Sequence, residues 1–254
     1  MTGWSAFSEE VARWRDAGRR VELWWRDDDA ADATAALDRL IELKCGASVP
    51  LALAVVPATA TPALAERVAS EPGIDLLQHG YAHVNHAAPS DKKAELGNER
   101  PSMHVLGELG TGRLALERLF GTRPLAVLVP PWNRIAPPLI PALPEIGFIG
   151  LSTFGNRLRR EPVRGLHQVN SHVDLIDWKV SRAFVGEEMA LASLVRALAA
   201  ARAGGEPVGV LSHHLAMDEP AWDFLNSLWK RATTMPGVTL RAAHELFASG
   251  EARG

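Results

Sequence analysis

The chain has 254 residues, of which 47% are hydrophobic, and a formal net charge of −3. This length and composition allow a large buried core and fit one α/β domain over residues 1–254. Lysine and arginine are spread along the sequence, which speaks against a nucleic-acid partner. No apolar run approaches the roughly 18 residues of a membrane span, and the charged N-terminal stretch lacks the apolar centre of a signal peptide. We therefore expect a cytoplasmic protein without a membrane partner, and the sequence leaves open whether it forms a homo-oligomer.

Strand and helix patterns alternate along the chain. Apolar runs predict strands at residues 21–25, 51–56, 74–77, 125–129, 148–151, 208–211 and 238–240, with one or two more within 165–178. Helical spacing predicts helices at residues 5–17, 32–45, from 61 onward, 102–120, 138–146, 187–203 and 221–231, and residues 243–248 close the chain. Such alternation predicts an α/β fold, specifically an irregular (β/α) barrel of about seven parallel strands. No Gly-x-Gly-x-x-Gly or phosphate-loop motif follows the first strand, which argues against a nucleotide-binding fold. The single cysteine, Cys45, has no partner for an internal disulfide and is expected in or near the core.

A histidine-rich segment at residues 78–86, QHGYAHVNH, follows one of the predicted strands. It holds three of the nine histidines, with His79 and His83 four positions apart and His86 after them. Imidazoles so closely spaced are typical ligands of a zinc-like metal, although a polar loop that happens to be rich in histidine is the alternative. For His86 a role in the loop is favoured over that of an outer or substitute ligand.

Polar groups follow five of the predicted strands at their C-terminal ends. These groups are Asp28–Asp29, His79–His83, Pro131–Asn133, Asp174–Asp177 and His213–His214. Because the carboxyl ends of parallel strands in a barrel face the same way and surround one mouth, we expect these groups to form an active site.

The residue types indicate the chemistry of such a site. Two imidazoles and one carboxylate, for which Asp29 is the candidate, supply three ligands and leave a position for water. Asp28 is then the candidate base, provided that the strand ends in a turn, since adjacent strand residues point to opposite faces. His213 is the candidate general acid, oriented by an aspartate such as Asp177. The alternative for residues 27–29 is a loop whose acids cap a helix. In either case the three adjacent carboxylates repel one another, so a cation, either Arg26 or a metal, is expected beside them.

In this order, four motifs resemble those of the polysaccharide deacetylase family of carbohydrate esterases. Residues 26–30 (RDDDA) resemble its Thr-Phe-Asp-Asp-Gly, and residues 79–83 (HGYAH) its His-Ser/Thr-x-x-His. Residues 174–178 (DLIDW) match Asp-x-x-Asp-Trp, and residues 211–213 (LSH) match Leu-x-His. The resemblance spans residues 26–213, most of the chain, and each motif is weak without the others.

The resemblance implies a distorted (β/α) barrel and a metal-dependent hydrolase that acts on carbon–nitrogen bonds other than peptide bonds. The substrate would be an N-acetylated (or O-acetylated) sugar or a related small amide, and the cofactor a divalent metal, with Zn²⁺ as the first choice. The implied roles are Asp28 as base, Asp29, His79 and His83 as metal ligands, Asp177 as the residue that orients the acid His213, and Trp178 and Leu211 as the lining of the acetyl pocket.

The chain also departs from the family pattern. Val129 stands where the third motif, Arg-x-Pro-x-Gly, has the arginine that holds the base, and either Arg26 or Arg134 is the candidate replacement. Gly80 replaces the Ser/Thr of the second motif, and Ala30 replaces the glycine of the first. These departures indicate a divergent branch and leave the substrate open.

Further residues near the expected mouth are candidates for substrate binding. Pro131 and Trp132 lie in the divergent third motif, and Trp132, like Trp178, is a candidate for stacking on a sugar. Tyr81, between the two histidine ligands, offers a hydroxyl or a backbone donor to an oxyanion. His214 either binds substrate or forms a structural hydrogen bond.

Two other functions remain open from the sequence alone. The missing arginine at Val129 makes a sugar-binding protein that has lost catalysis an alternative on the same barrel. A weaker alternative is a C–N hydrolase that uses this barrel without a metal.

Overall fold

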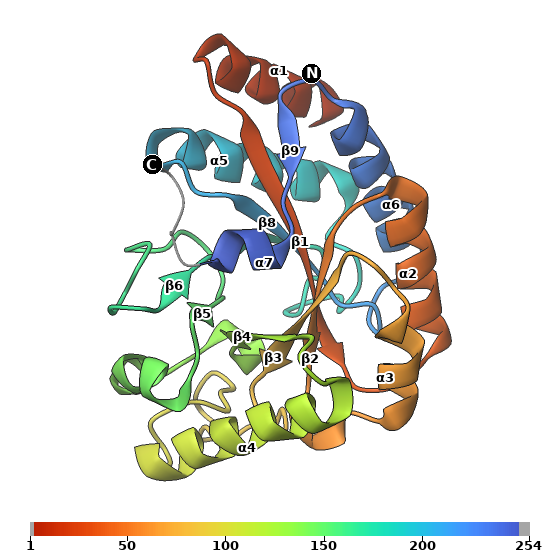
Figure 1. Cartoon of the computed structure of the whole chain (residues 1–254). Coiled ribbons are helices and arrows are strands. Elements are labelled where there is room, and N and C mark those ends of the chain that lie inside the picture. Colours follow the sequence, from red (N-terminus) through yellow and green to blue (C-terminus); the bar gives the residue numbers. More distant parts are fainter. Residues whose placement is uncertain (1–2, 249–254) are drawn as a thin grey trace. The chain divides into compact units, whose positions relative to one another are not determined.

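The structure, a computed structural model, describes residues 3–248 (Figure 1). These residues divide into two compact units, which we describe separately. The first unit contains residues 3–28, 34–51 and 171–243, and the second contains residues 29–33, 52–170 and 244–248. The single domain expected from the sequence stays a prediction.

The first unit combines parallel strands with four long helices. Its strands are β1 (Val21–Ala30, of which the last two residues belong to the second unit), β7 (Ser171–Asp174), β8 (Val208–Ser212) and β9 (Val238–Leu240). Its helices are α1 (Gly3–Asp16), α2 (Ala35–Ala47), α5 (Glu187–Gly204) and α6 (Glu219–Thr234).

The strand pairs of the first unit are all parallel. Strand β8 lies between β1 and β7, with Trp25 opposite Val210 on one side and Ser171 opposite Gly209 on the other. Strand β9 pairs with the first three residues of β1. Helix α5 packs on β7 and β8, and α1 packs on α5. The ends of β1, β7 and β8 therefore point in one direction, which places Asp28, Asp174 and His213 at the carboxyl ends of neighbouring strands.

The second unit has the same alternation with shorter elements. Its strands are β2 (Leu51–Val55, of which Leu51 belongs to the first unit), β3 (Ile74–His79), β4 (Pro124–Val129), β5 (Gly150–Leu151) and β6 (His167–Gln168). Its helices are η1 (Pro57–Thr59), α3 (Pro62–Ala69), α4 (Ser102–Phe120), η2 (Pro131–Asn133), η3 (Pro137–Ala142), η4 (Pro144–Ile146) and α7 (Ala243–Phe247, which begins at the last residue of the first unit).

Parallel pairing again sets the direction of the strands in this unit. Strand β4 pairs with β3 and with β5, and β5 pairs with β6. Helix α4 lies along β3 and β4 (Figure 1) and covers a core that includes Leu109, Leu128 and Phe148. His79, the last residue of β3, is opposite Val129, the last residue of β4. This register brings the histidine segment and the Pro131–Asn133 segment to the same end of the unit.

The α/β fold with parallel strands, predicted as an irregular (β/α) barrel, is confirmed, and most elements begin and end within a few residues of their predicted bounds. Two differences concern the site: β1 continues past Trp25 to Ala30, and the helix predicted at 138–146 consists of the 3₁₀ turns η3 and η4. Prolines at 141 and 144, inside the predicted helix, lack the N–H donors that a continuous α-helix needs. Cys45 is exposed, so its expected place in or near the core was wrong.

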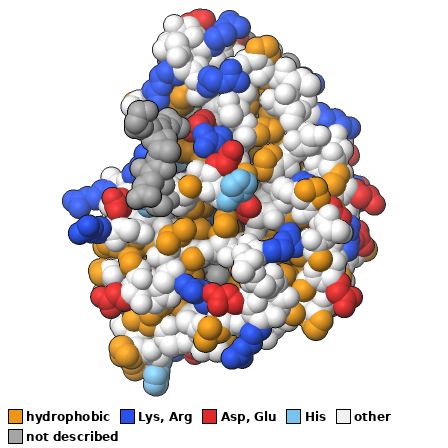
Figure 2. All heavy atoms as spheres, viewed as in Figure 1, with side chains coloured by type: hydrophobic (Ala, Val, Ile, Leu, Met, Phe, Trp, Pro, Cys, Tyr) orange, Lys and Arg blue, Asp and Glu red, His pale blue; other side chains and the backbone are white. Residues whose placement is uncertain are grey.

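The surface carries charges of both signs. On the face shown in Figure 2, basic and acidic side chains are interspersed, with hydrophobic side chains among them. No helix within residues 3–248 has the length and apolar character to cross a membrane.

Candidate metal centre and catalytic residues

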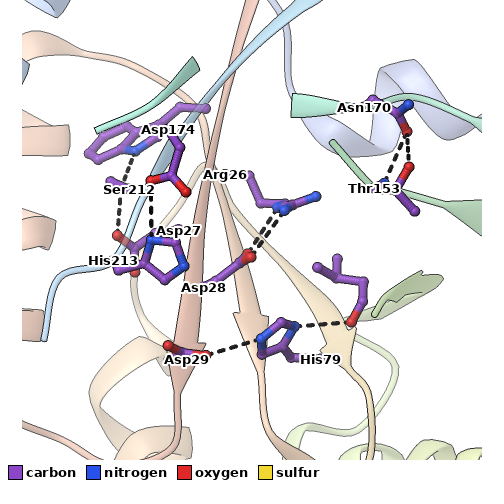
Figure 3. Close-up of polar contacts among 12 residues, drawn as sticks. Arg26, Asp27, Asp28, Asp29, His79, Thr153, Asn170, Asp174, Ser212 and His213 are labelled. Atoms are coloured by element: carbon purple, nitrogen blue, oxygen red, sulfur yellow. Dashed lines mark hydrogen bonds and ion pairs between the residues drawn. The ribbon is translucent and has the colours of Figure 1, made fainter. Parts of the chain in front are cut away.

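Three predicted metal ligands meet in the second unit. Asp29 Oδ1 lies 3.0 Å from His79 Nε2 and 3.2 Å from His83 Nε2. One ligand atom from each residue lies within 4.8 Å of the other two, and no other group of three such residues is found in the described part of the chain. His86 is not in this group; its backbone N–H donates to the carbonyl of Ala94 at 2.9 Å. Figure 3 shows the contact between Asp29 and His79.

The hydrogen bond of the His79 ring indicates that this group fits a cation. Its Nδ1 lies 3.0 Å from the carbonyl oxygen of Val129, which accepts but cannot donate, so Nδ1 carries the proton. In a neutral ring the lone pair of Nε2 then faces the carboxylate oxygen of Asp29 at 3.0 Å, an unfavourable contact between two acceptors. A proton on either the imidazole or the carboxyl group, or a bound cation, makes this contact favourable. Two imidazole nitrogens and a carboxylate oxygen are the ligand set of a zinc-like ion, and a backbone carbonyl that orients the ring is usual behind such a ligand.

The backbone around this group is strained. Asp29, His83, Trp132 and Asn133 have positive φ angles of 73°, 55°, 55° and 58°, a region that L-residues enter at a cost. Strand β1 continues through Asp29 to Ala30, so the turn required by the sequence is absent, but the positive φ of Asp29 interrupts the regular extended geometry of the strand. Such strain is found chiefly where function demands a particular geometry, which supports a site here.

The segment after β4 contributes an aromatic ring to the metal group. The ring centroid of Trp132 lies 4.4 Å from that of His83, with an angle of 51° between the planes. Pro131 is buried and begins the 3₁₀ turn η2. Trp132 therefore contacts a ligand directly, in addition to its predicted role in sugar stacking.

The backbone of Tyr81 does not offer the donor proposed from the sequence. Its N–H donates to the carboxylate of Glu95 at 3.1 Å, so this N–H is not available to an oxyanion. The hydroxyl of Tyr81 remains the other candidate donor.

In the first unit, Arg26 holds the predicted base. Arg26 Nε lies 2.9 Å from Asp28 Oδ1, and Nη2 donates to Oδ2 at 3.0 Å (Figure 3). Both side chains are buried, with exposed fractions of 0% and 2%. Two contacts from one guanidinium fix both the position and the rotation of a carboxylate. Arg134, the other candidate for this role, instead donates from Nη1 to the backbone carbonyl of Lys93 at 2.6 Å.

Asp174, rather than Asp177, is the carboxylate beside His213. Asp174 Oδ1 lies 3.8 Å from His213 Nδ1, and its carboxylate accepts from Ile176 N and from Trp178 Nε1, each at 3.0 Å. The predicted orienting role of Asp177 is therefore corrected: its Oδ1 accepts from the backbone N–H groups at 179 and 180. An aspartate in a tight turn readily satisfies such N–H groups.

The surroundings of Asp174 favour its neutral form. Burial raises the pKa of the Asp174 carboxyl and Asp28 adds to the rise, whereas His213 and the two hydrogen bonds to Asp174 partly lower the pKa. The Trp178 ring stands edge-on to the His213 ring at 4.8 Å between centroids and is 46% exposed. Leu211 is fully buried in β8.

Asp27 and His214 form a buried network on either side of His213. Asp27 accepts from the Ser212 hydroxyl at 2.5 Å and from the backbone N–H of His214 at 3.1 Å. His214 Nδ1 lies 2.5 Å from the other carboxylate oxygen, and Trp25 Nε1 donates to the Ser212 hydroxyl at 2.8 Å. His214 is 2% exposed, so its contacts support the structural role left open by the sequence more than a role in substrate binding. The network fixes both chain neighbours of His213.

Three side chains at these sites were missed or given other roles from the sequence. Asp174 was placed at the mouth but not beside the acid, and Asp27 was read only as a possible capping acid. Glu95 lies in an irregular segment without any motif, and no signal in the sequence marks it. Only Asp27 carried a usable signal, since an acid inside a buried strand needs partners.

Comparisons with known proteins give a match by structure alone. No protein-family model matches the chain, and no curated protein matches it either. A Mycobacterium smegmatis structure assigned as a polysaccharide deacetylase has 16% identity and a TM-score of 0.70, and covers 91% of this chain and 90% of its own. A peptidoglycan N-acetylglucosamine deacetylase has 17% identity and a TM-score of 0.59, with 92% and 91% covered. A family 4 acetyl xylan esterase from Clostridium thermocellum, in complex with a cobalt ion, has 16% identity and a TM-score of 0.53, with 89% and 90% covered.

The chain is therefore a protein with the fold of the polysaccharide deacetylases. This similarity extends over about nine-tenths of its length. These three structures are described as a polysaccharide deacetylase, a peptidoglycan N-acetylglucosamine deacetylase and an acetyl xylan esterase.

Proposed function

We propose that the chain is a metal-dependent hydrolase that removes an acetyl group from an N-acetylated or O-acetylated sugar, or from a related small amide. The observation that carries this proposal is the ligand group, in which Asp29 Oδ1 faces the Nε2 atoms of His79 and His83 at 3.0 and 3.2 Å. The cobalt ion of the acetyl xylan esterase supports a divalent ion at such a site. Zinc is our first choice for this chain because its ligands are two imidazoles and one carboxylate.

A divalent cation held by these three residues would polarise the acetyl carbonyl and make water a stronger nucleophile. Asp28, consecutive in the chain with the ligand Asp29, takes the proton from the attacking water. Its ion pair with Arg26 fixes the direction in which the carboxylate accepts that proton. General-base catalysis of this kind typically contributes about 10²–10⁴-fold.

His213 donates a proton to the leaving group. The bond between the carbonyl carbon and the amine nitrogen (or the ester oxygen) breaks, and the proton passes from the imidazolium to that leaving atom. Asp174 Oδ1, 3.8 Å from Nδ1 of His213, is the carboxylate beside this acid. The exposed ring of Trp178 offers an apolar wall beside the acid for the acetyl group.

The alternative of a catalytically impaired sugar-binding protein was motivated by the missing arginine at Val129. The pair between Arg26 and Asp28 weakens this motive, because a guanidinium holds the base carboxylate from another position. The alternative of hydrolysis without a metal needs a proton between His79 Nε2 and the Asp29 carboxylate, whereas a cation satisfies Asp29, His79 and His83 at once.

The experiment that tests the proposal compares metal content with acetate release. The purified protein is treated with a chelator, reconstituted with Zn²⁺, Co²⁺, Ni²⁺ or Mn²⁺, and assayed on N-acetylated chito-oligosaccharides, peptidoglycan fragments, acetylated xylan oligomers and small acetamides. We expect one metal per chain and acetate release that chelation abolishes and one of the metals restores. The variant Asp28→Asn should retain the metal and lose acetate release by about 100-fold or more.

The control is His104→Asn, which removes an exposed histidine of α4 and should change neither quantity. Stoichiometric metal without acetate release from any compound would favour the sugar-binding alternative. Full activity after exhaustive chelation would overturn the metal-dependent mechanism.

A further inference from the structure

Glu95 is a buried acid that contacts the loop between the two histidine ligands. Its Oε1 accepts from the backbone N–H of Ala82 at 2.7 Å, and its Oε2 accepts from the N–H of Tyr81 at 3.1 Å. The residue is 1% exposed. Tyr81 and Ala82 lie between His79 and His83, so one carboxylate binds the middle of the ligand loop through two charge-assisted hydrogen bonds.

Gly80 leaves the room that this carboxylate occupies. A Cβ atom on Gly80 would lie 2.0 Å from Glu95 Oε2 and 2.5 Å from Cδ of Pro131. The φ angle of Gly80 is +56°, which glycine adopts without the steric cost that other residues meet. The glycine at a position where the resembling family has Ser or Thr thus coincides with an acid that reaches in from another segment.

The segment that carries Glu95 is itself held on both sides. Asn85 Oδ1 accepts from the N–H of Ala94 at 2.9 Å, and the N–H of His86 donates to the carbonyl of Ala94 at 2.9 Å. Leu96 is buried, and its carbonyl accepts from the N–H of Ala136 at 2.7 Å. The carboxylate therefore has a fixed base from which it holds the ligand loop.

The charge of Glu95 has no partner of opposite sign within residues 3–248. Arg100 donates to the backbone carbonyl of Glu95 rather than to its carboxylate, and forms its ion pair with Glu108. A buried carboxylate that is satisfied only by two N–H groups remains costly. A divalent cation on Asp29, His79 and His83 would keep one positive charge that its ligands do not compensate. The negative charge of Glu95 behind the ligand loop would then offset this positive charge, and the cation would in turn stabilise the buried carboxylate.

We propose that Glu95 is a positioning residue of the metal centre, which sets the spacing of His79 and His83 and favours a bound dication by its charge. The inference rests on the proposed function, since it assumes that this group binds a metal. It assigns the support of the ligand loop to Glu95, for which Gly80 leaves room at a position where the second motif has Ser or Thr.

The test measures Zn²⁺ affinity by competition with a chromophoric chelator, for the wild-type protein and the variants Glu95→Gln and Glu95→Ala. Glu95→Ala should weaken Zn²⁺ binding by about 10- to 100-fold, the usual effect of removing a residue that supports a ligand. Glu95→Gln keeps one acceptor oxygen and loses the charge, so its Zn²⁺ affinity should lie between those of the wild type and Glu95→Ala. The matched control is Asp75→Asn, which alters an acid of the same unit that accepts from the backbone N–H of His244; its affinity should equal that of the wild type.

The results separate this inference from the function on which it rests. If the wild-type protein binds no stoichiometric Zn²⁺, the proposed function fails and the inference fails with it. If the wild type binds Zn²⁺ and both Glu95 variants bind it equally well, the inference alone is overturned. Should Glu95→Ala not fold, as judged by circular dichroism, the affinity of Glu95→Gln decides the outcome.

Discussion

Arg26 and Asp28 form a buried ion pair with two contacts, 2.9 Å from Nε to Oδ1 and 3.0 Å from Nη2 to Oδ2. The two residues are separated by one position on β1, so both side chains point to the same face of the strand. In the family that the chain resembles, the arginine that holds the base belongs to a different motif. Here the base and its holder come from one strand, and the position at Val129 is free to be a buried apolar residue.

The variant Arg26→Lys should impair the base without removing the metal. A lysine ammonium is a point charge that cannot contact both carboxylate oxygens as a planar guanidinium does. We expect acetate release to fall by about 10- to 100-fold, the effect of a small misplacement of a catalytic group, with unchanged metal content. Arg134→Lys is the control, since Arg134 bonds the carbonyl of Lys93, and it should leave the rate unchanged. Equal losses in both variants would contradict the assignment.

The variant Asp174→Asn should change the pH dependence of stability. Because the pKa of Asp174 is raised in the folded state, chiefly by burial, its contribution to stability is present below the unfolded pKa and is lost as pH rises through the folded pKa. The asparagine variant has no carboxyl group at this position, so its stability does not include this decrease with rising pH. Its free energy of unfolding, measured with urea from pH 4 to pH 7, should therefore gain on that of the wild type as pH rises. If the difference in the free energy of unfolding between the two proteins stays constant over this pH range, the prediction is wrong. The control is Asp177→Asn, which makes the same substitution in the same turn.

The variant Gly80→Ala should destabilise the protein and weaken metal binding. The new Cβ would meet both Glu95 and Pro131 at less than 3 Å and would sit on a residue with positive φ. We expect a loss of about 1–3 kcal/mol in the free energy of unfolding, as in other overpacked sites, together with a lower Zn²⁺ affinity. Denaturation with urea and chelator competition measure the two effects.

Gly107→Ala is the matched control for this prediction. Gly107 lies inside helix α4, and a Cβ there would meet nothing within 4 Å. Alanine should stabilise the helix by about 0.5–1 kcal/mol and leave the metal affinity unchanged. If Gly80→Ala behaves like this control, the close contact at Gly80 does not constrain the loop.

The variant Asp27→Asn should destabilise the end of β8 and misplace His213. The carboxylate of Asp27 serves the Ser212 hydroxyl and both the N–H and the ring of His214. An amide offers one acceptor oxygen in place of two, so at least one buried donor loses its partner, at a cost of about 1–3 kcal/mol. Urea denaturation should show this loss, and acetate release should fall although the metal content is unchanged. Ser212→Ala removes the hydroxyl that donates to Asp27 and accepts from Trp25 Nε1, and should also destabilise the protein while both contacts of His214 with Asp27 remain.

Much of the fold and part of the site follow from the sequence because their signals are local. The alternation of apolar runs with helical spacing predicts the parallel strands, since each element must bury its own apolar face. His79 and His83 are recognisable because they lie four positions apart after a strand, and Asp29 because an acid at a strand end has few roles. The α/β fold class and the three ligand residues could therefore be predicted from local patterns, without knowledge of contacts between distant segments.

The tertiary structure decided the contacts between segments. The sequence pattern does not show whether Asp174 or Asp177 lies beside His213. Both accept from backbone N–H groups of the turn at 174–180, and only Asp174 has a contact with the imidazole. Glu95 lies fifteen positions after Gly80 in an irregular segment, and no periodicity connects the two. Hydrogen bonds and close packing depend on where side chains meet in space. The folded chain alone therefore placed Glu95 behind the ligand loop, and it decided between Arg26 and Arg134 as the residue beside the base.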